Sequence, residues 1–224
     1  MHTNKRVEMV FASDYINKPK ELSDFIDALF SLHENGFERY FNVKDFSGCL
    51  SWEIEEIGNW FFDKEIYDTS AKAYKELVLN GNTDIVERIS EKIFSSARKI
   101  TNEGIVDVLE LICAIYQVPC AYASLALISN KKKDYNNSIE YAKRALAVSN
   151  NDNRYNVVLG DCYFYQKEYL KAIDCYKKVL LSKISSKELA QYSNDRIKCC
   201  CEILDGLKER ENKSGKRQIQ KRGN

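Results

Sequence analysis

A short pattern that opens with tyrosine returns at multiples of 34 residues along this chain. Its copies begin at Tyr67, Tyr135 and Tyr169, which lie 68 and 34 residues apart. In each copy, small and apolar residues follow at intervals of three or four. Self-similarity at a fixed period of this length is typical of repeat proteins, whose units bury their apolar faces by stacking. The sequence therefore predicts an array of equal units, and it favours binding over catalysis.

Each unit has the pattern of two antiparallel helices. In block 153–186 the first helix would carry Leu159 and Gly160, and the second would carry Ala172 and Tyr176. Residues three or four positions apart share one face of a helix, so these side chains can form a seam between the two. Gly160 would be small where the helices approach most closely. The chain has only 2 Pro and 9 Gly, which also favours long helices.

This spacing resembles the tetratricopeptide repeat (TPR), a 34-residue helix–turn–helix with the pattern W-x2-L-G-x2-Y, then A-x3-F, then P. The resemblance is close in 153–186, good in 51–84 and moderate in 119–152, whereas 85–118 shares only length and helicity. The Trp position holds Ile54, Tyr122 and Asn156, and the Pro position holds Asn82, Asn150 and Ile184. The resemblance implies an all-α fold, namely a short right-handed α-solenoid of helix hairpins.

The predicted organisation has three parts. Residues 1–50 form an N-terminal segment with one amphipathic helix that packs on the array. Residues 51–207 hold the four units, of which 85–118 is degenerate, and a capping helix that starts near Lys187. An array of this kind needs a cap to cover its last unit. The apolar stripe of the cap could alternatively form a homodimer seam, but packing within the chain is favoured. Residues 208–224 form a basic, disordered tail.

The charge is distributed unevenly. Residues 208–224 hold seven Lys or Arg and two Glu, which leaves 27 basic and 31 acidic residues, a net charge of −4, for the rest of the chain. Most tails of this kind keep a protein soluble, so we expect no nucleic-acid partner. The stretch 111–129 has no charged residue, but Pro119 interrupts it and the repeat register places a turn there. We therefore expect no contact with a membrane.

The residues that carry chemistry are sparse. The chain has 8 Cys and 2 His without a CxxC pair or a zinc-ligand spacing, so we expect no metal and no cofactor. Free thiols in this number fit a reducing compartment, and we expect a cytoplasmic protein. No phosphate-binding glycine loop and no nucleophile with a paired base is visible. We therefore expect that the protein is not an enzyme.

The resemblance implies a concave groove lined by the first helix of each unit, at its second, fifth, ninth, twelfth and thirteenth residues. In block 119–152 the last two of these are Asn130 and Lys131. The apolar and aromatic character of the groove favours a peptide with apolar anchors. Alternatively, the aromatic residues pack only between adjacent units. The candidate partner-binding residues are Trp52, Asn59, Phe62, Leu127, Arg154, Val157, Asp161, Phe164 and Tyr165.

The main hypothesis is a cytosolic adaptor, or protein–protein interaction scaffold, that holds a partner peptide in this groove. The family's carboxylate clamp, which grips the acidic ends of heat-shock chaperones, needs Lys, Asn and Arg where this chain carries residues such as Ala123 and Glu188. We therefore expect no such co-chaperone role. Two alternatives remain open: a chaperone of the secretion-system type, and a peptide-sensing regulator that contacts nucleic acid through its basic tail.

Overall fold

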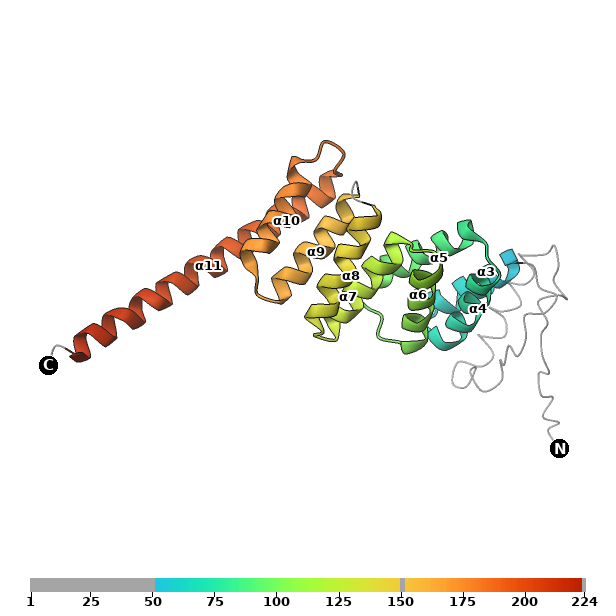
Figure 1. Cartoon of the computed structure of the whole chain (residues 1–224), viewed down its shortest axis with the longest axis horizontal. Coiled ribbons are helices and arrows are strands. Elements are labelled where there is room, and N and C mark those ends of the chain that lie inside the picture. Colours follow the sequence, from blue (N-terminus) through green and yellow to red (C-terminus); the bar gives the residue numbers. More distant parts are fainter. Residues whose placement is uncertain (1–50, 150–151, 223–224) are drawn as a thin grey trace, which may run out of the picture. The chain divides into compact units, whose positions relative to one another are not determined.

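The computed structural model describes residues 51–149 and 152–222 (Figure 1). The predicted N-terminal segment, with its amphipathic helix, lies outside the described residues. Within them every regular element is an α-helix, as the repeat pattern predicts. The helices are α3 (Ser51–Asp63), α4 (Tyr67–Leu79), α5 (Thr83–Ser96), α6 (Glu103–Ile115), α7 (Pro119–Lys131), α8 (Tyr135–Val148), α9 (Asn153–Tyr165), α10 (Tyr169–Leu181) and α11 (Lys187–Arg222).

The described residues divide into two compact units. The first unit holds 51–89 and 101–116, where α4 packs against both α3 and α6. The second unit holds 90–100 and the residues from 117 onward, with the hairpins α7–α8 and α9–α10 followed by α11. The division falls within block 85–118, which is also the block that matches the repeat pattern only in length.

The turns inside three of the hairpins have the same backbone geometry. Glu65, Lys133 and Lys167 adopt positive φ angles of 62°, 65° and 66°. Each donates its backbone N–H over 3.0 Å to the carbonyl three residues earlier. The tyrosine two residues later then begins the second helix, at Tyr67, Tyr135 and Tyr169. The predicted period is therefore confirmed as a repeat of structure.

The two helices of a hairpin approach most closely where the sequence places glycine. A Cβ atom at Gly58 would lie 2.7 Å from Cε1 of Tyr74, and one at Gly160 would lie 2.6 Å from Cε1 of Tyr176. Both tyrosines are completely buried. Only glycine leaves room for these rings. The seam therefore needs a glycine on the first helix wherever the second helix buries a tyrosine ring.

The start of α11 covers the last hairpin. Tyr192, Ile197 and Leu204 pack against a buried cluster that includes Tyr176 and Cys200. This is the apolar stripe that the sequence predicts for a closing helix. Its burial shields apolar surface of α10 from water, which stabilises the end of a stacked array.

Helix α11 continues to Arg222, whereas the sequence analysis assigns 208–224 to a disordered tail. The difference has a local reason: the segment is rich in Lys, Arg, Glu and Gln, which favour helix, and it contains no proline. The basic residues of this segment up to Arg222 therefore lie on a helix.

The uncharged stretch 111–129 is shared between the end of α6 and the start of α7, with Pro119 as the first residue of α7. Proline at that position is favourable because its missing N–H would have no helical partner. Across the described residues, none of the helices combines the length and the apolar character that a bilayer crossing requires.

Candidate functional site

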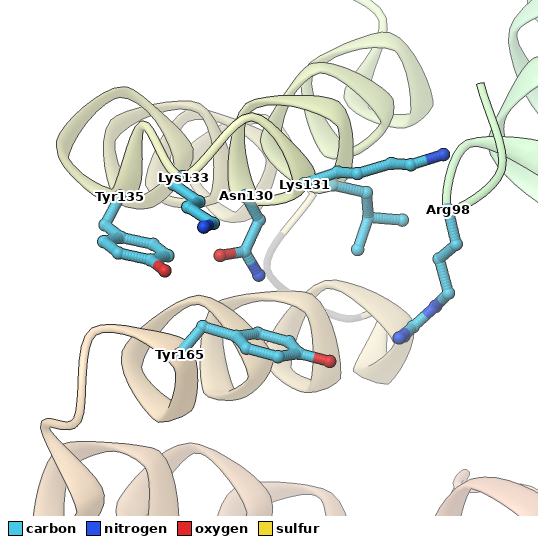
Figure 2. A pocket seen from close by; sticks show the side chains of 7 residues that line it. Arg98, Asn130, Lys131, Lys133, Tyr135 and Tyr165 are labelled. Atoms are coloured by element: carbon cyan, nitrogen blue, oxygen red, sulfur yellow. The ribbon is translucent and has the colours of Figure 1, made fainter. Parts of the chain in front are cut away.

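A cavity of about 350 Å³ lies in the second unit, beside the two first helices α7 and α9 (Figure 2). These helices pack against each other, so the pocket belongs to the first-helix face of two successive repeats. The residues that line it are Arg98, Leu127, Asn130, Lys131, Lys133, Tyr135 and Tyr165.

The repeat geometry places most of these side chains. Asn130 and Lys131 lie three and four residues after Leu127, so both are its neighbours on the surface of α7. Lys133 occupies the turn residue with positive φ, and Tyr135 begins α8. In Figure 2 the side chains of Asn130, Lys133 and Tyr135 extend toward the helix that carries Tyr165.

Three cationic side chains reach the pocket, and they differ in their bonding. Arg98 Nη2 donates to Asp161 at 2.6 Å, while half of the Arg98 side chain remains exposed. Lys131 Nζ donates to the backbone carbonyl of Lys99 at 2.7 Å. The Lys133 ammonium has no ion-pair partner among the residues described. The pocket therefore has a positive wall that is only partly neutralised.

Asn130 provides an unusual polar group at this place. Its side chain is 9% exposed, and its Oδ1 atom is buried with no hydrogen-bond donor in the described part of the chain. Leaving such an acceptor unsatisfied costs about 1–3 kcal/mol. In Figure 2 its amide group points into the pocket. A donor supplied by a bound molecule would recover part of this free energy.

Asp161, one of the predicted groove residues, holds the neighbouring elements together. Its carboxylate is completely buried and accepts hydrogen bonds from Tyr176 Oη at 2.7 Å and from Tyr192 Oη at 2.9 Å. Arg98 binds its second oxygen, and Arg196 Nε lies 3.6 Å away. Burial and the Asp161 charge raise the pKa of Tyr192 to about 12. Asp161 therefore fixes Arg98 at the edge of the pocket without itself reaching solvent.

Stacked hairpins of this geometry occur in solved structures. A thermophilic TPR protein of Thermus thermophilus, TTC0263, is 15% identical, and the match covers 81% of this chain and 98% of that one with a TM-score of 0.51. This chain has the TPR fold. A MamA structure from Desulfovibrio magneticus RS-1, residues 41 to the end, is 16% identical, covers 75% and 93% of the two chains and has a TM-score of 0.48. No protein-family model and no curated protein matches the sequence.

The structural match to TTC0263 shows a common fold and says nothing about a common partner. Its low sequence identity fits the loss of the Trp and Pro signatures noted in the sequence. The TPR unit here depends on the glycine–tyrosine seam and on the turn with positive φ, and both are present in α3–α4 and α9–α10.

Of the nine predicted groove residues, Leu127 and Tyr165 line the pocket beside α7 and α9. Tyr165 is 50% exposed, whereas Leu127 is buried, with 6% of its surface exposed. Val157 is buried. The Phe164 ring lies 3.7 Å from the Arg196 guanidinium and packs on the cluster beneath α11. Phe164 therefore contributes to the cover of the last hairpin.

Arg154, the predicted cationic residue of the groove, is engaged by two carboxylates. Its Nη atoms donate to Glu91 at 2.8 and 2.9 Å, and Nη2 donates to Asp152 at 2.6 Å. The guanidinium also lies over the ring of Phe94. These hydrogen bonds lower the pKa of Glu91. Arg154 therefore links the residues around Glu91 to the start of α9.

The other three predicted groove residues belong to the first unit. Trp52 is half-buried at the start of α3. Asn59 Oδ1 accepts a hydrogen bond from Tyr74 Oη at 2.8 Å. Phe62 is 4% exposed and makes an edge contact with the ring of Tyr67. Asn59 and Phe62 thus hold the α3–α4 seam.

Three of the described cysteines, Cys120, Cys162 and Cys175, are buried thiols. Burial raises the pKa of both Cys120 and Cys162 to about 12, and that of Cys175 to about 11. A thiol with a raised pKa is a poor nucleophile at neutral pH. Among the residues with a described position, no group of three His, Cys, Asp or Glu side chains is arranged to hold a metal ion.

The repeat pattern does not assign Arg98, Lys133 and Tyr135 to a site. Tyr135 stands out in the sequence only as the first residue of a repeat copy, and Lys133 lies in the turn beyond the first helix. Arg98 comes from the link between α5 and α6, where the repeat pattern is lost. The sequence signal that could have identified Lys133 is its position two residues before the repeated tyrosine, in the turn that joins the two helices of a hairpin.

Proposed function

We propose that this protein is a non-catalytic scaffold that binds a segment of a partner protein in the pocket beside α7 and α9. The observation that carries the proposal is a preformed cavity on the first-helix face of two stacked TPR units. Its volume lies in the range of ordinary ligand sites. The half-exposed ring of Tyr165 and the side chain of Leu127 offer it an apolar surface.

The chemistry of the pocket supports binding rather than catalysis. Its lining consists of cationic side chains, two tyrosines, an amide and a leucine. None of these seven residues is a carboxylate, a histidine or a thiol that could act as a general base or nucleophile at neutral pH. In addition, the described part of the chain contains seven cysteines, all of them free thiols, which favours a reducing compartment such as the cytoplasm.

The test is capture of partners with the full chain from an extract, followed by mass spectrometry. Tyr165→Ala removes the exposed anchor and is expected to lose the specific partner. Leu181→Ala is the matched control, because Leu181 is 84% exposed and does not line the pocket. Equal recovery of the same partners by both variants would contradict the proposal.

Two other substitutions are less suitable for this purpose. Phe164→Ala would open space beneath α11, and Arg154→Ala would leave Glu91 and Asp152 without their shared cation. Either variant could lose a partner through loss of stability. A chain shortened before residue 208 tests the alternative regulator: salt-sensitive nucleic-acid binding that depends on this segment, and not on Tyr165, would favour that function.

A further inference from the structure

We infer that the pocket recognises an acidic side chain on an extended segment of the partner, with Lys133 facing the carboxylate and Asn130 bonded to the partner's main chain. The inference rests on the proposed function and specifies its ligand. The juxtaposition that carries it is a buried amide oxygen without a hydrogen-bond donor, Asn130 Oδ1, in the same cavity as cationic side chains.

The charges point to an anionic group. Three of the seven lining residues are cationic and none is acidic. Arg98 already binds Asp161 and also interacts with Tyr192, whereas Lys133 has no ion-pair partner among the described residues. Hydrogen bonds between a cation and a carboxylate are about twice as strong as neutral ones. An acidic side chain would therefore gain most from a position beside Lys133.

The amide of Asn130 points to a peptide. An ionised carboxylate has no hydrogen-bond donor to offer, so it would not satisfy the buried Oδ1 acceptor. A main-chain amide presents an N–H donor and a carbonyl acceptor, which complement the two ends of an asparagine side chain. Extended peptides are commonly held through their main chain in this manner, while pockets select their side chains.

The remaining lining residues suit the side chains that flank the acidic one. Tyr135 and Tyr165 come from different hairpins, and Leu127 adds an apolar side chain from α7. Tyrosine rings offer a large apolar surface and a polar tip, and they lose little rotational freedom on binding. An apolar residue next to the acidic one would contact these rings.

A single carboxylate fits the molecule better than a polyanion. Outside 208–224 the chain has a net charge of −4, which disfavours approach of a nucleic acid to the pocket. Of the cations, Lys133 comes from a turn and Arg98 from the α5–α6 link, whereas Lys131 is the last residue of α7. The first-helix positions used by the family's carboxylate clamp carry Ala123 and Leu127 instead. The arrangement is therefore not that clamp.

The test is a selection of random linear peptides displayed on phage, carried out on the full-length chain. The expected result is enrichment of peptides with Asp or Glu next to an apolar residue. Lys133→Glu is expected to abolish this enrichment. Lys167→Glu is the matched control, because Lys167 has the same turn conformation, with φ of 66° against 65°, and does not line the pocket.

The affinities of one selected peptide and of its Glu→Gln counterpart are then compared by fluorescence anisotropy. We expect the neutral peptide, and separately Lys133→Glu, to bind about tenfold or more weakly. Enrichment of peptides without an acidic residue, or equal loss with Lys167→Glu, would overturn the inference and leave peptide binding in place. Absence of any enriched peptide would overturn both this inference and the proposed function.

Discussion

Arg98 and Asp161 lie 63 residues apart in the sequence, and a guanidinium nitrogen of the first lies 2.6 Å from a carboxylate oxygen of the second. Arg98 thereby belongs to the pocket wall and to a buried polar network at the same time. Because the Asp161 carboxylate is completely buried, its hydrogen bonds hold α9, α10 and α11 to the α5–α6 link. This network determines where the cationic edge of the pocket lies.

We expect Asp161→Asn to destabilise the second unit by about 3 kcal/mol, because removal of one partner leaves buried groups uncompensated. The measurement is urea-induced unfolding followed by circular dichroism. Asp195→Asn is a suitable control, since Asp195 is exposed on α11 and pairs only with Gln191 in the described structure. If both variants unfolded at the same urea concentration, the network would have no structural importance.

Tyr192 should make stability depend on alkaline pH. Burial and the Asp161 charge raise its pKa from 10 to about 12, so the folded state favours the protonated hydroxyl. Its contribution is therefore complete below pH 10 and is lost as the pH rises toward 12. Unfolding free energies measured between pH 9 and pH 12 should fall less steeply for Tyr192→Phe than for the natural chain. Parallel curves would contradict this assignment.

The hairpins could be predicted from sequence because each depends on a few residues at fixed spacing. Gly160 and Tyr176 are 16 residues apart, as are Gly58 and Tyr74, and both pairs form the same contact. The copies of the repeated tyrosine also follow equivalent turns. The glycine–tyrosine contact forms although the Trp and Pro positions of the repeat hold other residues, because it requires only one small and one large side chain.

The site was harder to predict because the repeat pattern does not encode which positions remain accessible. Asp161 stands at a groove position, yet the hydroxyls of Tyr176 and Tyr192 reach it and exclude solvent. Conversely, Arg98 enters the pocket from a link that follows no repeat rule. Both outcomes depend on contacts between residues distant in sequence, which spacing alone does not reveal.

The close contact at Gly160 predicts a strong response to one added methyl group. In Gly160→Ala the new Cβ would meet the ring of Tyr176, which is buried and held by Asp161 and therefore cannot move aside easily. We expect a loss of stability of about 1–3 kcal/mol.

Gly206→Ala is the matched control for this substitution. A Cβ at Gly206 would meet nothing within 4 Å, and the residue lies inside α11, so alanine there should stabilise by about 0.5–1 kcal/mol. Thermal unfolding of the two variants tests the pair. A stabilising effect at both positions would show that the α9–α10 seam has room for a methyl group, contrary to the contact described.

The hairpin turns should become more stable when glycine replaces the residue with positive φ. Lys167 adopts a left-handed conformation with φ of 66°, which costs a residue with a side chain about 1–2 kcal/mol. Glycine tolerates this conformation but loses more backbone entropy on folding, by about 0.5–1 kcal/mol. We therefore expect Lys167→Gly to raise the free energy of unfolding by up to about 1 kcal/mol.

Lys177→Gly, at an exposed position inside α10, is the control and should instead lower the free energy of unfolding by about 1 kcal/mol. Urea unfolding of both variants separates the two effects, and a similar loss in each would mean that the turn has no left-handed residue at 167.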